Sequence, residues 1–157
     1  MKKFIISCFI AFCLLSGLNA EEGFKNEAGI RAGFFNGMTF RYVIKDKFGI
    51  ETILDSRWRG FEIIGLYEIY KHAFNTERLN WYFGAGGHVG IFNGNYVTWG
   101  THGTSYEVIG IDGIAGLEYS FRKIPLSIGL DWKPAFSVFG YSGIWADDGA
   151  ISIRYIF

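Results

Sequence analysis

Cysteine and proline are both scarce in this chain. Among its 157 residues there are two cysteines and two prolines. Cys8 and Cys13 both fall within one apolar run, Phe4 to Leu15, near the N-terminus. The rest of the sequence has no cysteine, which excludes a disulfide framework, a catalytic thiolate and a Cys-based metal site there.

An excess of either charge is also lacking. The 15 basic and 15 acidic residues give a formal net charge of zero. Removal of an N-terminal segment with Lys2 and Lys3 but no acid would shift the balance slightly toward acid. Proteins that bind nucleic acid usually carry a strong basic surplus. We therefore expect no nucleic-acid partner.

The N-terminus has the pattern of an export signal. Lys2 and Lys3 precede the apolar run, and the small-residue stretch Ser16 to Ala20 follows it. This arrangement is typical of a cleaved secretory signal peptide, and the run is too short for a permanent membrane helix. The sequence predicts a signal peptide at 1–20 and a single domain at 21–157.

Aromatic residues and glycines are abundant, with 16 Phe, 9 Tyr, 5 Trp and 22 Gly. Beyond the apolar run, no segment of useful length has helical periodicity, whereas alternation of apolar and polar residues recurs along the chain. It predicts an all-β domain with eight antiparallel strands. The expected strands are Ala28–Phe35, Gly37–Ile44, Phe48–Asp55, Phe61–Phe74, Leu79–Phe92, Ile109–Phe121, Pro125–Val138 and Ala150–Phe157.

The connections between these strands differ in length. Short turns are expected at 45–47, 75–78 and 122–124, and longer loops at 56–60, 93–108 and 140–149. The pair Asn36-Gly37 is a hairpin signal between the first two strands. Short turns at one end, mostly longer loops at the other and an even strand number are typical of an up-and-down transmembrane β-barrel, with both termini on the periplasmic side.

The two faces of the strands decide between a soluble and a membrane barrel. A lipocalin-like soluble barrel turns its apolar face inward, whereas a transmembrane barrel turns it toward lipid. The apolar face here is rich in Trp, Phe, Leu and Ile, too bulky for the narrow interior of eight strands, whereas the polar face combines glycines with charges. The expected interior charge network consists of Arg31, Arg41, Glu51, Glu62, Glu68, Asp112, Glu118, Asp131, Lys133 and Arg154.

The C-terminal strand carries the clearest resemblance to a known family. Ile151, Ile153, Tyr155 and Phe157 share one face, and Ser152 and Arg154 share the other. Together with the alternating strands and the charged interior, this strand resembles the small eight-stranded outer-membrane barrels of the OmpA/OmpX type. The resemblance implies an assembly signal at Ile151, Ile153, Tyr155 and Phe157. It also implies location in the outer membrane of a Gram-negative bacterium, contact with lipid and lipopolysaccharide, and a monomer without a wide pore.

Fold alone does not determine function. Some barrels of this class are lipid A-modifying enzymes, and the acyltransferase kind uses an Asp, a Ser and a His near the outer rim. Asp55, Ser56 and His102 are the corresponding candidates, although Asp55 and Ser56 are also good turn formers.

Three scattered histidines without paired spacing give a weak case for a metal, and we expect His88 to be a hydrogen-bonded interior residue. The leading prediction is therefore a non-enzymatic barrel with a structural or surface-interaction role and no catalytic residues, metal or cofactor. An acyltransferase, a narrow channel and a soluble periplasmic binding barrel remain as alternatives.

Overall fold

The computed structural model describes residues 24–45, 47–74 and 76–157. The predicted signal peptide at 1–20 lies outside these ranges. The described residues form an all-β structure in which no helix is long and apolar enough to cross a membrane. The strands are β1 (Phe24–Gly33), β2 (Asn36–Ile44), β3 (Phe48–Arg57), β4 (Gly60–Ala73), β5 (Thr76–Asn93), β6 (Ser105–Ser120), β7 (Leu126–Trp132), β8 (Ala135–Phe139), β9 (Gly143–Trp145) and β10 (Gly149–Ile156).

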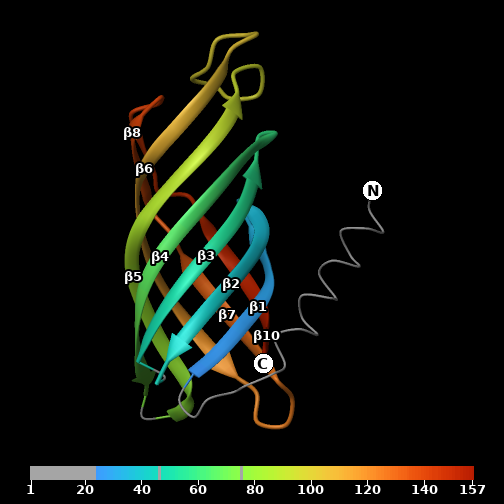
Figure 1. The fold of residues 1–157 in the computed structure, drawn as a ribbon, viewed down its shortest axis with the longest axis vertical. Helices are drawn as coiled ribbons and strands as arrows, with labels where there is room; N and C mark the ends of the chain where they lie inside the picture. Colours follow the sequence, from blue (N-terminus) through green and yellow to red (C-terminus); the bar gives the residue numbers. More distant parts are fainter. Residues whose placement is uncertain (1–23, 46, 75) are drawn as a thin grey trace.

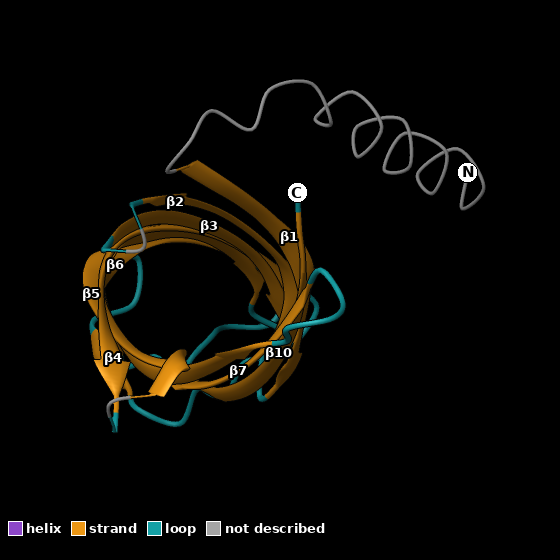
Figure 2. Cartoon of the chain, turned by 90° about the horizontal axis from the view of Figure 1, so that it is seen from below, coloured by secondary structure: helices purple, strands orange, loops and turns teal. Residues whose placement is uncertain are grey.

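These strands close into an eight-stranded antiparallel barrel (Figures 1 and 2). Each of β1 to β6 pairs with the next strand along the chain. The ring closes because β6 pairs with β7, β7 with β10, and β10 with β1. Closure leaves the pairing edges of the sheet satisfied, which is how a barrel avoids open edges.

The seventh position of the barrel is divided between β7 and β8. The sequence predicted one strand over Pro125–Val138, and the structure interrupts it at Lys133 and Pro134. Proline has no backbone N–H to donate to a ladder, but its carbonyl accepts a hydrogen bond from the Gly113 N–H at 2.8 Å. The register is the same on both sides, since Ala115 pairs with Trp132 and Asp112 with Ala135. The interruption therefore leaves the inward and outward faces unchanged.

The eighth position is also divided. The short strand β9 pairs with β8, and β10 pairs with β7. The connecting residues 146–148 lie beside the interruption at Lys133, whose N–H donates to the Asp148 carbonyl at 2.7 Å. This part of the predicted loop 140–149 is thus folded back along the barrel wall.

Two predicted connections are corrected. The loop predicted at 56–60 is a two-residue turn of Trp58 and Arg59, both with positive φ, because β3 and β4 extend further than predicted. Asn36-Gly37 does not form the first turn. The turn consists of Phe34 and Phe35, and the Asn36 side chain accepts a hydrogen bond from the Gly33 N–H at 3.2 Å.

The two ends of the barrel differ. At the turn end, β2, β4 and β6 pass into the next strands through short connections, and the C-terminal residue Phe157 exchanges backbone hydrogen bonds with Asn26 of β1. At the loop end, β5 and β6 extend beyond their neighbours (Figure 1) and are joined by residues 94–104. The beginning of β1 and the C-terminus therefore lie together at the turn end.

Candidate functional site in the barrel interior

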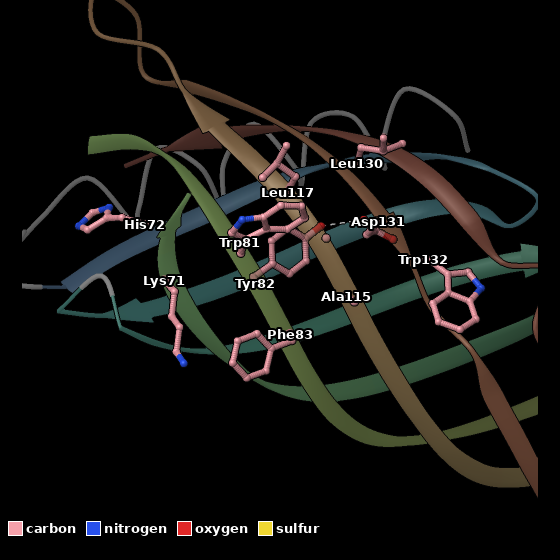
Figure 3. A pocket seen from close by; sticks show the side chains of 11 residues that line it. Lys71, His72, Trp81, Tyr82, Phe83, Ala115, Leu117, Leu130, Asp131 and Trp132 are labelled. Atoms are coloured by element: carbon pink, nitrogen blue, oxygen red, sulfur yellow. Dashed lines mark hydrogen bonds between the residues drawn. The ribbon is translucent and has the colours of Figure 1, made fainter. Parts of the chain in front are cut away.

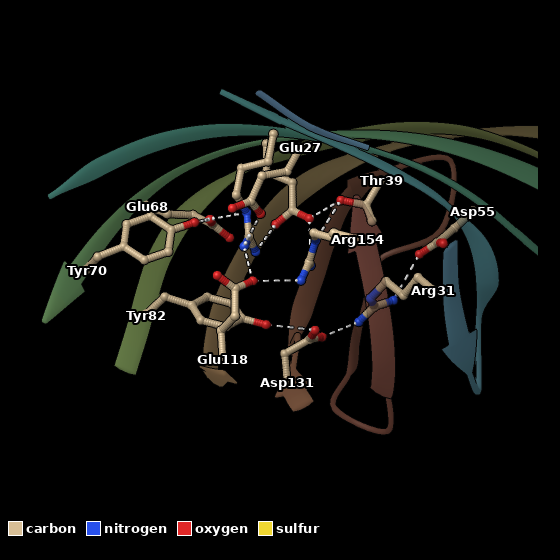
Figure 4. Close-up of polar contacts among 12 residues, drawn as sticks. Glu27, Arg31, Thr39, Asp55, Glu68, Tyr70, Tyr82, Glu118, Asp131 and Arg154 are labelled. Atoms are coloured by element: carbon tan, nitrogen blue, oxygen red, sulfur yellow. Dashed lines mark hydrogen bonds and ion pairs between the residues drawn. The ribbon is translucent and has the colours of Figure 1, made fainter. Parts of the chain in front are cut away.

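The inward-facing positions place a dense set of charges in the barrel. Because side chains alternate across a strand, every second residue of β1 to β7 and β10 points inward. All ten residues predicted for the interior network, namely Arg31, Arg41, Glu51, Glu62, Glu68, Asp112, Glu118, Asp131, Lys133 and Arg154, are buried. They form three groups along the barrel, two of which appear in Figure 4.

The group nearest the turn end is centred on Arg41 of β2. Its guanidinium lies 2.6 Å from Glu118, 3.0 Å from Glu51 and 3.1 Å from Glu68. Glu27 lies further away, at 3.5 Å. This one cation therefore joins carboxylates from strands β1, β3, β4 and β6.

Aromatic rings enclose the same guanidinium. It lies 4.8 Å from the ring centroid of Tyr82 and 5.5 Å from that of Tyr70, whose hydroxyl donates to Glu68. A planar guanidinium can donate two hydrogen bonds to a carboxylate and can also stack on the face of an aromatic ring. Arg41 is thus held by charge and by stacking at once.

Arg154 of β10 shares two carboxylates with Arg41. Its Nη2 lies 2.9 Å from Glu51 and its Nη1 lies 3.1 Å from Glu118. The Thr39 hydroxyl also donates to Glu51. The closing strand is therefore connected through side chains to β2, β3 and β6, in addition to its backbone pairing.

The middle group surrounds Arg31 of β1. Its guanidinium pairs with Asp131 at 2.6 Å, Asp55 at 3.1 Å and Asp148 at 3.2 Å. Asp131 also accepts a hydrogen bond of 2.9 Å from the Tyr82 hydroxyl, which links this group to the one below it.

The third group, nearest the loop end, contains the predicted interior histidine. His88 Nδ1 lies 2.8 Å from the Asp112 carboxylate and Nε2 lies 3.1 Å from the Ser137 hydroxyl. A carboxylate accepts hydrogen bonds, so Nδ1 donates to Asp112. Lys133 pairs with Asp148 at 3.0 Å and with Asp112 at 3.4 Å.

Glu62 is the least satisfied side chain of this interior. Neither of its carboxylate oxygens has a hydrogen-bond partner, and its nearest basic nitrogen, His88 Nε2, lies 3.5 Å away. Counting every buried charged residue described, the interior has nine carboxylates, Glu27, Glu51, Asp55, Glu62, Glu68, Asp112, Glu118, Asp131 and Asp148, against four cations, Arg31, Arg41, Lys133 and Arg154. The interior is therefore acidic.

An aromatic cluster fills the barrel above these charges. Phe35, Phe92 and Trp145 are buried and their rings are in contact, with centroids 5.4 Å apart for Phe92 and Trp145 and 6.2 Å apart for Phe35 and Trp145. Trp99 and Tyr141 pack against this cluster, and their rings are stacked at 4.4 Å. Side chains from the loops thus close the interior at the loop end.

A charged pair borders this cluster, because the Arg57 guanidinium lies 4.9 Å from the Phe35 ring centroid. The Arg57 Nη2 donates to the Asp147 carboxylate at 2.7 Å. This hydrogen bond lowers the pKa of Asp147 below its usual range, with a smaller contribution from the guanidinium charge. The pair joins the end of β3 to the β9–β10 connection.

The structure gives the three candidate catalytic residues separate partners. Asp55 is buried and bound to Arg31, and the Ser56 hydroxyl donates to the Gly60 carbonyl at 2.9 Å. His102 Nδ1 lies 3.1 Å from the Asn95 amide oxygen in the 94–104 loop. The described contacts do not join the three side chains into a relay.

The predicted assembly residues lie on the outer face of β10. Ile151, Ile153 and Tyr155 are each about half exposed, and the Tyr155 and Phe157 rings are stacked with centroids 6.1 Å apart.

Sequence reasoning missed three interior acids, Glu27, Asp55 and Asp148. Asp55 was considered only as a catalytic candidate, although it keeps the same alternation as Glu51. Glu27 precedes the predicted start of the first strand, yet it keeps the same alternation as Gly29 and Arg31, so extending that strand by one residue would have found it. Asp148 lies in a loop, where no periodic signal exists. Among the described residues, no group of three or more His, Asp or Glu side chains is arranged to hold a metal ion.

No protein-family model matches the sequence of this chain, and no curated protein matches it.

Proposed function

We propose that this chain is an integral outer-membrane β-barrel protein with a structural or surface-interaction role. The observation that carries the proposal is the polarity of the barrel, which is charged inside and apolar outside. Leu130, Ile30 and Ile111 are about 60% exposed on the outer face, while the residues facing the other way include buried Arg31 and Asp112.

This polarity suits a hydrocarbon environment. Soluble monomers rarely expose contiguous apolar patches larger than a few hundred Å², and a soluble barrel carries its apolar side chains inside. Here large apolar side chains are exposed on all eight positions of the ring. Removing the exposed part of these side chains from water on membrane insertion would contribute about 25 cal/mol per Å² of apolar surface. In lipid, closure of the ring satisfies the backbone polar groups that no water could reach.

The filled interior supports a role other than wide-pore transport. Arg31, Arg154, Tyr82, Phe35 and Phe92 are among the largest fully buried side chains, and they span the barrel from the turn end to the loop end. The proposal therefore assigns no solute pathway and no catalytic activity. The surface available for partners is the loop end, where β5, β6 and residues 94–104 extend furthest (Figure 1).

The exposed apolar face of β10 supports recognition by the outer-membrane assembly machinery. Ile151, Ile153 and Tyr155 present three large side chains in one row, and pockets that take alternate side chains of a strand are how a partner recognises such a segment.

Membrane fractionation tests the proposal. The protein should sediment with outer membranes, resist extraction by alkaline carbonate, and migrate differently on gels when boiled and unboiled, because a closed barrel resists unfolding by detergent. Recovery in the soluble periplasmic fraction without detergent would contradict the proposal.

A further inference from the structure

The outer face of the barrel is hollowed where β4, β5, β6 and β7 lie side by side (Figure 3). The groove has a volume of about 780 Å³, within the range of about 300–1,000 Å³ typical of ligand pockets. Its apolar walls come from three neighbouring strands, and Lys71 and His72 of β4 lie at one end. The wall residues are Trp81, Phe83, Ala115, Leu117, Leu130 and Trp132.

The strand register explains why the surface is hollow here. Ala115 of β6 pairs with Phe83 on one side and with Trp132 on the other. A methyl group between two large aromatic side chains leaves a depression with rings as its walls. The Trp132 ring is fixed, because its Nε1–H donates to the Ala146 carbonyl at 2.7 Å. The depression is therefore built into the wall and needs no side chain to move.

The charge at one end of the groove indicates what it would bind. Lys71 is exposed and lies two residues before the end of β4, and its Nζ is 5.5 Å from the Phe83 ring centroid. Further basic residues flank the same turn end in the part of the chain that the structure describes, namely Lys45, Lys47, Arg78, Arg122 and Lys123. An apolar groove that ends at a cation within a basic rim is complementary to a molecule with an acyl chain and an anionic head.

We propose that this groove is a binding site for an anionic glycerophospholipid of the periplasmic leaflet. One acyl chain lies between the Phe83 and Trp132 rings over Ala115, and the phosphate pairs with Lys71. This inference rests on the proposed membrane location, because only a barrel in a bilayer meets such a lipid from the side.

Native mass spectrometry of the detergent-purified protein tests the site. The probes are dioleoylphosphatidylglycerol and dioleoylglycerol, which share acyl chains and differ in the phosphate-containing head. Ala115→Trp fills the depression, and Lys71→Gln removes the cation. The matched controls are Ala32→Trp on the exposed outer face of β1 and Lys123→Gln in the β6–β7 turn.

The wild type should retain one phosphatidylglycerol, and Ala115→Trp should lose it. Lys71→Gln should weaken phosphatidylglycerol binding about fivefold, the change given by about 1 kcal/mol per basic side chain near an anionic surface. The same variant should leave dioleoylglycerol binding unchanged, and both control variants should behave as wild type.

Retention of phosphatidylglycerol by Ala115→Trp would overturn the site, as would equal losses in Lys71→Gln and Lys123→Gln. A dimer mass that Ala115→Trp abolishes would also overturn it, since a second copy would then occupy the groove. These outcomes are separable from failure of the proposed function. A protein that stays in the outer membrane and shifts on boiling, but retains no lipid, refutes this inference alone.

Discussion

Removing the Arg41 side chain charge should destabilise the barrel strongly. In Arg41→Met, the methionine keeps an apolar stem between the Tyr70 and Tyr82 rings but no longer neutralises carboxylates. Arg154 still pairs with Glu51 and Glu118, whereas Glu27 and Glu68 lose the only ion-pair partner described for them. Removing one partner of a buried ion pair costs about 3–5 kcal/mol, because the remaining charge is left without compensation. We expect a loss of this size.

The assay is urea unfolding in lipid vesicles, followed by tryptophan fluorescence and by the mobility of unboiled samples on gels. Adding Glu27→Gln and Glu68→Gln to Arg41→Met should recover most of the lost free energy, because the uncompensated charges are then gone. Asp147→Asn is the control. It removes the Arg57 ion pair at its half-exposed carboxylate and leaves the Arg57 guanidinium over the Phe35 and Trp58 rings, and exposed pairs contribute about 0–1 kcal/mol. A loss for Arg41→Met no larger than for this control, or no recovery in the triple variant, would refute the reasoning.

Three further predictions concern the loops, the packing and the pore. Arg57 lowers the pKa of Asp147 in the folded state. The pair should therefore stabilise the protein at pH values above the ordinary Asp pKa, and this stabilisation should be lost as the pH falls through the lowered pKa. NMR titration should show that the pKa of Asp147 rises in Arg57→Met. Gly116→Val should cost about 1–3 kcal/mol by overpacking, because an added Cβ would clash with the inward Tyr82 ring. Gly113→Val should unfold at the wild-type urea concentration, because the atom nearest to an added Cβ there belongs to Pro134, at 3.6 Å. In planar bilayers the wild type should give no steady conductance, and stable single-channel steps would contradict a filled interior.

Most of the barrel wall could be predicted because period-two alternation reports the two faces directly. Strands such as β5 and β6 keep large apolar residues outward and place glycines, charges or polar groups at most inward positions, with Tyr82, Phe92, Val108 and Ile114 as the inward apolar exceptions. The same pattern located Arg31, Asp112 and Asp131 in the interior. It could not predict which charges pair, because the partners are far apart in the sequence. Arg31 is separated by 100 residues from Asp131 and by 117 residues from Asp148.

The loop end was beyond the reach of sequence periodicity. Trp145 and Tyr141 lie in a segment without alternation, yet they pack with Phe35 of the β1–β2 turn and Phe92 of β5. Their burial depends on the three-dimensional closure of the barrel. The interruption at Pro134 could have been predicted, because proline has no N–H to donate to the hydrogen bonds between strands. The alternation of apolar and polar residues nevertheless continues across Pro134, so the pattern predicted one uninterrupted strand.

The central claim is that the outer face of the barrel contacts the hydrocarbon of a membrane. The most direct test is to measure the free energy of unfolding of Ile30→Arg in lipid vesicles. Ile30 is 60% exposed on the outer face near the middle of β1. An arginine facing lipid at the bilayer midplane costs about 2–4 kcal/mol, so the variant should lose stability by that amount, while Glu107→Arg near the loop end of β6 should not. A surface substitution in water changes stability by only about 0.5 kcal/mol, and such a result for Ile30→Arg would contradict the account.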